Sequence, residues 1–232
     1  MVNEAYTANG LYNADCIAAM RTMPNECVDM VLTDPPYNIN FIPQRDKTKG
    51  AILNDDLSVE DFDKLLGDYF TECYRLLKGN AFLITFMSWA TIPAFERALR
   101  AAGFAIKSMP IWVKNNFGIG YYTRPQYEPM YLAIKGNPPP PETAISDVLQ
   151  YARVVKQVHT CEKPIPLLQR LINTFSHEGD VIFDGFAGGG TTAIAARKLR
   201  RKYICFELDK GYFDIASRRI DNEFAQASFL WD

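Results

Sequence analysis

The residues Asp34-Pro35-Pro36-Tyr37 combine a carboxylate, two rigid rings and an aromatic face. The Asp34 carboxylate and the Pro35 carbonyl can both accept hydrogen bonds, and consecutive prolines leave that carbonyl little freedom to move. The Tyr37 ring offers a face on which a planar group can stack. Alone, the motif is as consistent with an ordinary turn as with a site, because Asp and Pro are common turn residues.

A second candidate site is the glycine-rich run from Asp184 to Thr192, with Glu207 23 residues beyond Asp184. A strand, a glycine-rich turn and a helix, followed by an acid after the next strand, is the order that binds nucleosides. The spacing G-x-G-x-x-G is absent, which disfavours a pyrophosphate. S-adenosylmethionine fits, because Glu207 could accept both ribose hydroxyls. A glycine-rich turn without a ligand is the alternative, and the two flanking acids disfavour it.

The run Asp184-Gly185-Phe186-Ala187-Gly188-Gly189-Gly190-Thr191-Thr192 resembles the methyltransferase motif D-P-F-x-G-S-G-T-T, with Gly185 replacing proline and Gly189 replacing serine. His159-Thr160-Cys161-Glu162-Lys163-Pro164 resembles the H-x-x-x-K-P element of DNA amino-methyltransferases, and Asn13-Ala14-Asp15-Cys16 resembles their G-D-x element. The resemblance implies a cofactor site made by Asp15, Cys16, Asp34, Lys163, Asp184, Phe186, Ala187, Gly188, Gly190, Thr191, Thr192, Glu207 and Leu208.

The motif Asp34-Pro35-Pro36-Tyr37, called the clamp from here on, lies about 150 residues before the glycine-rich motif. This order resembles the β group of these enzymes, in which the sheet is circularly permuted. The resemblance implies site-specific methylation of adenine N6 in double-stranded DNA, as in restriction–modification. D-P-P-Y more often accompanies adenine, and cytosine N4 is the nearest alternative. A non-catalytic partner subunit that binds cofactor or DNA is the alternative from another class. The catalytic residues would be Asp34, Pro35, Pro36 and Tyr37.

An amino group on a nucleobase is a poor nucleophile, because its lone pair is delocalised into the ring. Acceptors held against its N–H bonds return electron density to the nitrogen. A sulfonium methyl is already a good electrophile, so direct transfer mostly needs positioning. The chain has no Pro-Cys dipeptide, the element that ring-carbon cytosine methyltransferases use for covalent catalysis. The motifs therefore indicate direct transfer to an extruded base that stacks on Tyr37.

Contacts with DNA are expected from two stretches that carry basic and aromatic residues. The loop 38–56 is expected to be mobile, and the stretch from Ile111 to Gly136 resembles one beside the target-base pocket of these enzymes. A short target-recognition segment is expected at 137–158. Either the recognised DNA site is short, or the loop or a second subunit, as in a homodimer, contributes to recognition. The candidate DNA-binding residues are Arg45, Lys47, Lys49, Lys114, Asn115, Tyr122 and Arg124.

Buried strands and amphipathic helices that alternate along the chain must position these residues. The pattern predicts an α/β fold with a mostly parallel, doubly wound sheet. The expected strands are 28–33, 81–86, 104–113, 130–134, 181–183 and 203–206. The expected helices begin at Ser58, with Gly79 as C-cap, at Thr91, at Pro164, at Thr191 and at Tyr212.

Composition sets the remaining expectations. A chain of 232 residues predicts one methyltransferase domain over 1–232. A net charge of -2 disfavours binding of nucleic acid through bulk charge, so any basic face must be local. No apolar run approaches the roughly 20 residues of a membrane helix, and the N-terminus lacks a secretory pattern, so a cytoplasmic protein is expected. The spacing of the five cysteines and two histidines indicates no metal site, and the thiols are expected to have no catalytic role.

Overall fold

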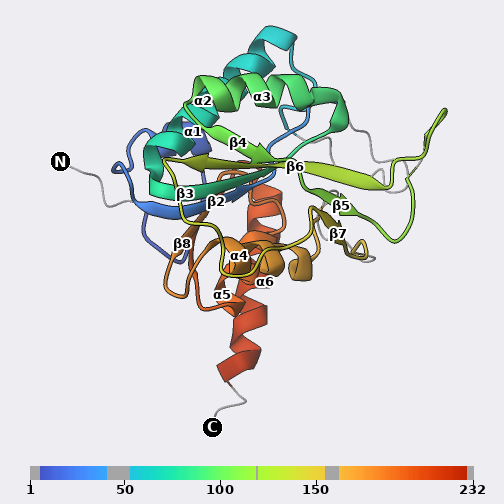
Figure 1. Ribbon diagram of the computed structural model, residues 1–232. Helices are drawn as coiled ribbons and strands as arrows, with labels where there is room; N and C mark the ends of the chain where they lie inside the picture. The colour runs from blue at the N-terminus through green and yellow to red at the C-terminus, as the bar shows by residue number, and fades with distance from the viewer. Residues whose placement is uncertain (1–5, 41–52, 119, 155–161, 229–232) are drawn as a thin grey trace.

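The computed structural model describes residues 6–40, 53–118, 120–154 and 162–228. A nine-stranded sheet lies at the centre, with helices on both faces (Figure 1). The strands are β1 (Gly10–Asn13), β2 (Val28–Thr33), β3 (Leu77–Phe86), β4 (Ala105–Ser108), β5 (Ile111–Val113), β6 (Tyr127–Lys135), β7 (Val148–Gln150), β8 (Val181–Asp184) and β9 (Lys202–Glu207). The helices are α1 (Cys16–Met20), α2 (Val59–Leu76), α3 (Ile92–Ala101), α4 (Ile165–Phe175), α5 (Thr191–Lys198) and α6 (Lys210–Ser228), with a 3-10 turn η1 (Trp89–Thr91).

The strand order is β1-β9-β8-β2-β3-β6-β5-β7, and β4 also pairs with β6. The first five strands in this order are parallel, whereas β6 runs antiparallel to β3, β4 and β5. The predicted α/β class with a mostly parallel sheet is therefore confirmed. The carboxyl ends of β2, β8 and β9 meet at one edge, where ligands bind in open parallel sheets.

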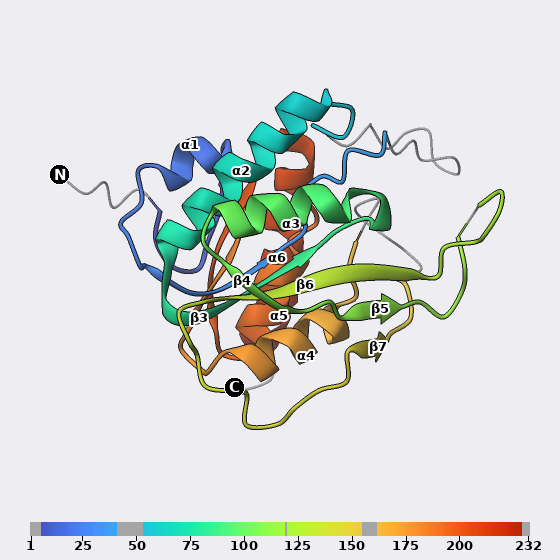
Figure 2. The same cartoon turned by 45° about the horizontal axis from the view of Figure 1, so that its top comes forward.

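Two helical layers cover the sheet, as the two views show (Figures 1 and 2). Helices α1, α2 and α3 lie on one face, and α4, α5 and α6 on the other. Alternation along β2 explains this arrangement, because Val31 packs into the first layer while Met30 and Leu32 pack into the second. A strand buried on both faces reads as a continuous apolar run.

Helix α2 begins as predicted and ends earlier. The Ser58 side chain accepts from the Asp61 backbone N–H at 3.1 Å and caps the helix. The prediction that Gly79 caps the other end is wrong, because α2 ends at Leu76 and Gly79 lies within β3. Leu77 is fully buried and already pairs with Val28 of β2, so sheet pairing replaces the glycine cap.

The predicted strand 104–113 is two strands, β4 and β5, separated at Met109 and Pro110. Pro110 has no N–H to donate, and its carbonyl accepts from Met130 at 2.8 Å. Strand β6 begins at Tyr127, three residues before the predicted start. The short elements β1, α1 and β7, of four, five and three residues, were not predicted. Within the described ranges, no helix has both the length and the apolar character needed to cross a membrane.

Candidate active site

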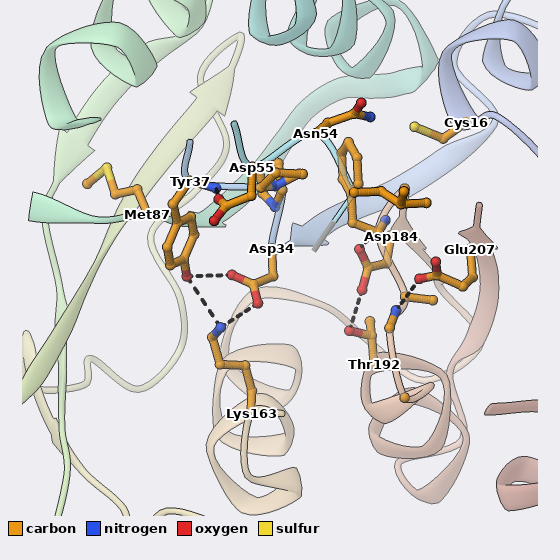
Figure 3. Close-up of a pocket in the computed structure, with 18 of the residues that line it drawn as sticks. Cys16, Asp34, Tyr37, Asn54, Asp55, Met87, Lys163, Asp184, Thr192 and Glu207 are labelled. Carbon is orange, nitrogen blue, oxygen red and sulfur yellow. Dashed lines mark hydrogen bonds and ion pairs between the residues drawn. The ribbon is translucent and has the colours of Figure 1, made fainter. Parts of the chain in front are cut away.

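A cavity of about 440 Å³ opens where β2, β8 and β9 end. Its walls include both motifs, because Asp34 follows β2 and Asp184 ends β8 (Figure 3). Glu207 ends β9 and also lines the cavity. The predicted site residues among its walls are Asp15, Cys16, Asp34, Pro35, Pro36, Tyr37, Lys114, Lys163, Asp184, Phe186, Ala187, Gly188, Thr191, Thr192, Glu207 and Leu208. Two motifs far apart in the chain thus face one space.

Asp184 organises the glycine-rich turn from within. Its carboxylate accepts from the Thr192 hydroxyl at 2.6 Å, from the Phe186 N–H at 3.0 Å and from the Thr33 hydroxyl at 3.1 Å. Burial raises the pKa of Asp184 to about 6, although these donors oppose the rise. The predicted residue Gly190 does not line the cavity; it caps α5 with φ at +76°, in the left-handed region that glycine tolerates.

Glu207 reaches back to the turn from the end of β9. One carboxylate oxygen accepts from the Gly188 N–H at 2.8 Å, and the other accepts from the Asp209 N–H at 2.8 Å. Burial raises the pKa of Glu207 to about 7, against the effect of these two N–H groups. Each oxygen keeps a further lone pair for a hydroxyl donor. The apolar residues Phe186 and Leu208 line the cavity together with Glu207.

Asp15 and Cys16 stand at the start of α1. The Asp15 side chain accepts from the Ala18 N–H at 2.9 Å and caps that helix. Cys16 is buried, and burial raises the pKa of its thiol far above the ordinary value. The described cysteines Cys16, Cys27, Cys73 and Cys205 are free thiols, and Cys161 lies outside the described residues. Among the described residues, no group of His, Cys, Asp and Glu could hold a metal ion.

The clamp forms a connected set of polar groups. The Tyr37 hydroxyl donates to one Asp34 oxygen at 2.5 Å, and the Lys163 ammonium donates to the other. Burial raises the pKa of Asp34, while the positive charge of Lys163 opposes that rise. The Tyr37 backbone N–H donates to Asp55 at 3.1 Å, which fixes the end of the motif. Sequence reasoning missed Asp55, a buried acid in a polar loop that carries no motif.

Lys163 lies on the clamp side of the cavity. Its Nζ stands 3.3 Å from the Tyr37 hydroxyl and 3.2 Å from Glu128. Sequence reasoning missed Glu128, which belongs to β6 and also pairs with Lys114 at 2.5 Å. An acid inside an otherwise apolar strand is the pattern that could have revealed it. Lys114, a candidate for DNA contact, therefore has a buried acidic partner and is itself mostly buried.

Of the other candidate DNA-binding residues, Asn115, Tyr122 and Arg124 are described, and they do not line the cavity. Arg45, Lys47 and Lys49 lie outside the described residues. Figure 2 shows the connection between β5 and β6 extending away from the sheet. In this connection Tyr122 is 95% exposed, and the Arg124 guanidinium stacks on the Phe117 ring at 4.1 Å. Asn115 instead accepts from the Arg153 N–H at 3.1 Å. The candidate recognition segment 137–158 contains β7, which pairs with β5 and extends the sheet.

The model of the DNA methylase family N6_N4_Mtase matches residues 28–154 and 141–218. YubD of Escherichia coli (strain K12) is 34% identical over 206 residues, which cover 89% of this chain and 87% of YubD. The DNA adenine methyltransferase YhdJ of the same organism is 28% identical over 259 residues, covering 94% of this chain and 84% of YhdJ.

Solved structures show the same fold. The complex of M1.HpyAVI with SAM superposes with a TM-score of 0.68 at 25% identity, covering 90% of this chain and 98% of that chain. The cytosine-N4-specific PvuII DNA methyltransferase superposes with a TM-score of 0.74 at 15% identity, covering 95% of this chain and 93% of that chain. At 15% identity the second likeness concerns the fold alone.

Proposed function

The chain belongs to the N6/N4 DNA methylase family and is an S-adenosylmethionine-dependent DNA methyltransferase, and we propose that it methylates adenine at N6 within a specific sequence. The observation that carries the proposal is the cavity shared by Asp34 and Glu207. Asp34, which would hold the base amine, and Glu207, which would hold the nucleoside part of the cofactor, then line one cavity. The relative YhdJ, named as an adenine methyltransferase, favours adenine as the base.

The residues at the β8 and β9 side of the cavity fit S-adenosylmethionine. Glu207 offers a carboxylate for the two ribose hydroxyls, and it already accepts from the Gly188 N–H. Phe186 and Leu208 offer apolar surface for the adenine ring. The backbone N–H groups that open α5 lie at the positive end of the helix dipole, where a carboxylate is stabilised. The cofactor supplies a methyl carbon on a sulfonium, whose carbon–sulfur bond breaks as the amine nitrogen bonds to that carbon.

The clamp residues prepare the amine for that step. Asp34 and the Pro35 carbonyl accept its two N–H bonds, so electron density returns to the nitrogen as the new bond forms. Tyr37 carries the face on which the extruded base stacks. The nitrogen becomes positive when it gains the methyl group and returns to neutral when it loses one proton, which Asp34 takes up and passes to solvent. Each proposed role needs an ionised Asp34, which Lys163 favours against the effect of burial.

Double-stranded DNA is the proposed substrate, and the β5–β6 connection is the proposed contact outside the cavity. Lys114, Pro125 and Tyr127 at its base line the cavity, whereas Tyr121 and Tyr122 are each 95% exposed. Exposed tyrosines next to an arginine provide stacking and phosphate contacts. Bases beside the target adenine would then rest on this connection. A homodimer that completes the recognition surface stays part of the proposal.

Asp34→Ala is the variant that tests the assignment. Methyl transfer from labelled cofactor to DNA should be abolished, while the Kd for S-adenosylmethionine should change less than about twofold because Asp34 faces the amine. Equal loss of both would contradict the division of the cavity into two halves.

Digestion of the methylated DNA to nucleosides identifies the base. N6-methyladenine supports the proposal, and N4-methylcytosine would replace it with the nearest alternative, since the same clamp can present either amine. Cofactor binding without methyl incorporation by the wild-type chain would favour a non-catalytic partner subunit.

A further inference from the structure

Four charged side chains alternate in sign along the clamp side of the cavity: Lys114, Glu128, Lys163 and Asp34. Lys114 Nζ lies 2.5 Å from one Glu128 oxygen, and Lys163 Nζ lies 3.2 Å from the other. Lys163 also donates to the Asp34 oxygen that Tyr37 does not contact. Figure 3 shows Lys163 reaching up toward Asp34 and Tyr37, away from Glu207. This charge chain therefore belongs to the clamp and not to the glycine-rich turn.

The charge chain is mostly shielded from water. The Lys163 side chain is 5% exposed, and that of Glu128 is 22% exposed. Two positive and two negative charges sum to zero, so each ion has an opposite neighbour in a place where an unmatched charge would be costly. The aromatic faces of Phe86 and Tyr37 lie 4.9 Å and 5.5 Å from Lys163 Nζ and give the ammonium a further favourable surface.

Glu128 and Asp34 respond differently to this environment. Burial raises the pKa of Glu128, but the combined charges of Lys163 and Lys114 outweigh that effect and lower it to about 2. The two ammonium groups thus favour the ionised form of Glu128. Burial raises the pKa of Asp34, and the Glu128 charge adds to that rise while Lys163 opposes it. Lys163 thus pairs with two different carboxylates: Glu128, whose pKa is lowered, and Asp34, whose pKa is raised.

We propose that Lys163 takes the place of the substrate amine on Asp34 in the free protein and moves onto Glu128 when the base enters, so that Glu128 is a positioning residue. The proposal rests on the proposed role of Asp34. An ammonium is a stronger donor than a base amine, so an Asp34 oxygen that accepts from Lys163 is a poorer acceptor for the amine. Glu128 Oε2, 3.2 Å from Lys163 Nζ, offers the ammonium a second site that needs only a small movement.

The proposal predicts opposite effects of two substitutions on one carboxyl group. Lys163→Met removes the positive neighbour and should raise the titration midpoint of Asp34 by about one pH unit or more. Glu128→Gln removes the negative neighbour and should lower the midpoint. The double variant should titrate between the two single variants. Carboxyl carbon NMR on the protein with labelled aspartate follows Asp34, which is assigned from the signal lost in Asp34→Asn.

Two further groups that interact with Asp34, Tyr37 and Asp184, are left unchanged in these variants. Tyr37 donates to Asp34. Asp184, whose pKa the Asp34 charge helps to raise, serves as an internal reporter. Lys78→Met is the matched control, because it breaks the Lys78–Asp29 pair at 2.6 Å outside the cavity. It should leave the Asp34 titration unchanged.

Kinetics separate positioning from binding. Glu128→Gln should lower kcat about tenfold, as loss of one charge-assisted contact does, with Kd for S-adenosylmethionine within about twofold of wild type. Shifts of Asp34 in one direction for both variants, or no shift, would overturn the proposal. A cofactor affinity that falls in step with kcat in Lys163→Met would make Lys163 a cofactor ligand instead. If Lys163→Met does not fold, the lowered midpoint in Glu128→Gln decides alone.

The titration needs neither DNA nor turnover, so it stands apart from the assay of the proposed function. If the wild-type chain methylates no base, the proposed function fails. The opposite shifts of Asp34 then still test whether Lys163 and Glu128 set its charge.

Discussion

The Thr33 hydroxyl donates to the Asp184 carboxylate at 3.1 Å, across the boundary between β2 and β8. Both side chains are buried, and the two strands are parallel neighbours. Thr33 is the last residue before the clamp, and Asp184 is the first residue of the glycine-rich turn. Together with the backbone pairing of β2 and β8, this contact holds the two halves of the cavity side by side, where a methyl group must pass from one to the other.

Glu207 should make cofactor affinity depend on pH. Its pKa is raised to about 7 in the folded protein, so the free protein holds a neutral carboxyl below that pH. Ribose hydroxyls donate best to the ionised form. Affinity for S-adenosylmethionine should therefore increase as pH rises from about 5.5 to about 7.5, with release of a proton on binding. Calorimetry in two buffers of different ionisation enthalpy measures both quantities.

Glu207→Gln should remove that dependence, because the amide oxygen still accepts but does not titrate over this range. An unchanged pH dependence in the variant would assign it to another group. The raised pKa also has a consequence for stability. The unfolded chain ionises near 4.5 and the folded chain near 7, so Glu207 lowers the stability of the free protein as pH rises between these values.

Gly185 should not tolerate a larger side chain. A Cβ at this position would lie 2.5 Å from Tyr69 Cε2, and the Gly185 N–H donates to the Tyr69 hydroxyl at 3.2 Å. Tyr69 therefore occupies the space that a side chain at position 185 would need. Gly185→Ala should lower the free energy of unfolding by about 1–3 kcal/mol, and Gly185→Pro by more because it also removes the donor.

Urea denaturation measures these losses. Gly67→Ala is the matched control, since a Cβ at Gly67 on α2 meets nothing within 4 Å. It should stabilise the protein by about 0.5–1 kcal/mol, as an alanine does in a helix. Equal stability of Gly185→Ala and wild type would mean that Tyr69 moves aside at little cost.

Tyr121 and Tyr122 should matter for duplex DNA and not for the fold. Their side chains are 95% exposed, so replacing both with serine should leave the unfolding temperature unchanged. Base stacking on an aromatic ring contributes about 1–3 kcal/mol, so KM for a duplex substrate should rise roughly tenfold or more. Replacement of both with phenylalanine keeps the rings and should retain binding. A serine variant with the KM of wild type would remove this connection from the DNA-binding surface.

Arg219 of α6 should support cofactor binding from behind the glycine-rich turn. Its guanidinium donates to the Gly189 carbonyl at 2.9 Å and pairs with Glu162 at 2.5 Å. Arg219→Ala removes the hydrogen bond that holds the Gly189 carbonyl in place. The Kd for S-adenosylmethionine should therefore rise about tenfold, the effect of losing roughly one charged hydrogen bond. Arg219→Lys keeps the charge and should lose less. Unchanged affinity in Arg219→Ala would mean that Asp184 and Glu207 hold the turn unaided.

The sequence by itself determined the class of fold and the two motifs, because both depend on local chemistry. Alternating apolar runs and helical stripes require a parallel sheet, and a rigid Asp-Pro-Pro-Tyr turn after a buried strand keeps its shape in any such sheet. Glycines in a strand-to-helix turn are equally local. These features can be predicted without knowing which residues pack against them.

Only the tertiary structure decided which distant groups share the cavity. Glu128 on β6 and Lys163 before α4 lie 35 residues apart, and the antiparallel pairing of β6 with β3 brings Glu128 to the end of β2. The same holds for Tyr69, whose ring explains the glycine at position 185. Ion pairs and steric limits depend on distances across the sheet and its helical layers, and no periodicity along the chain encodes those distances.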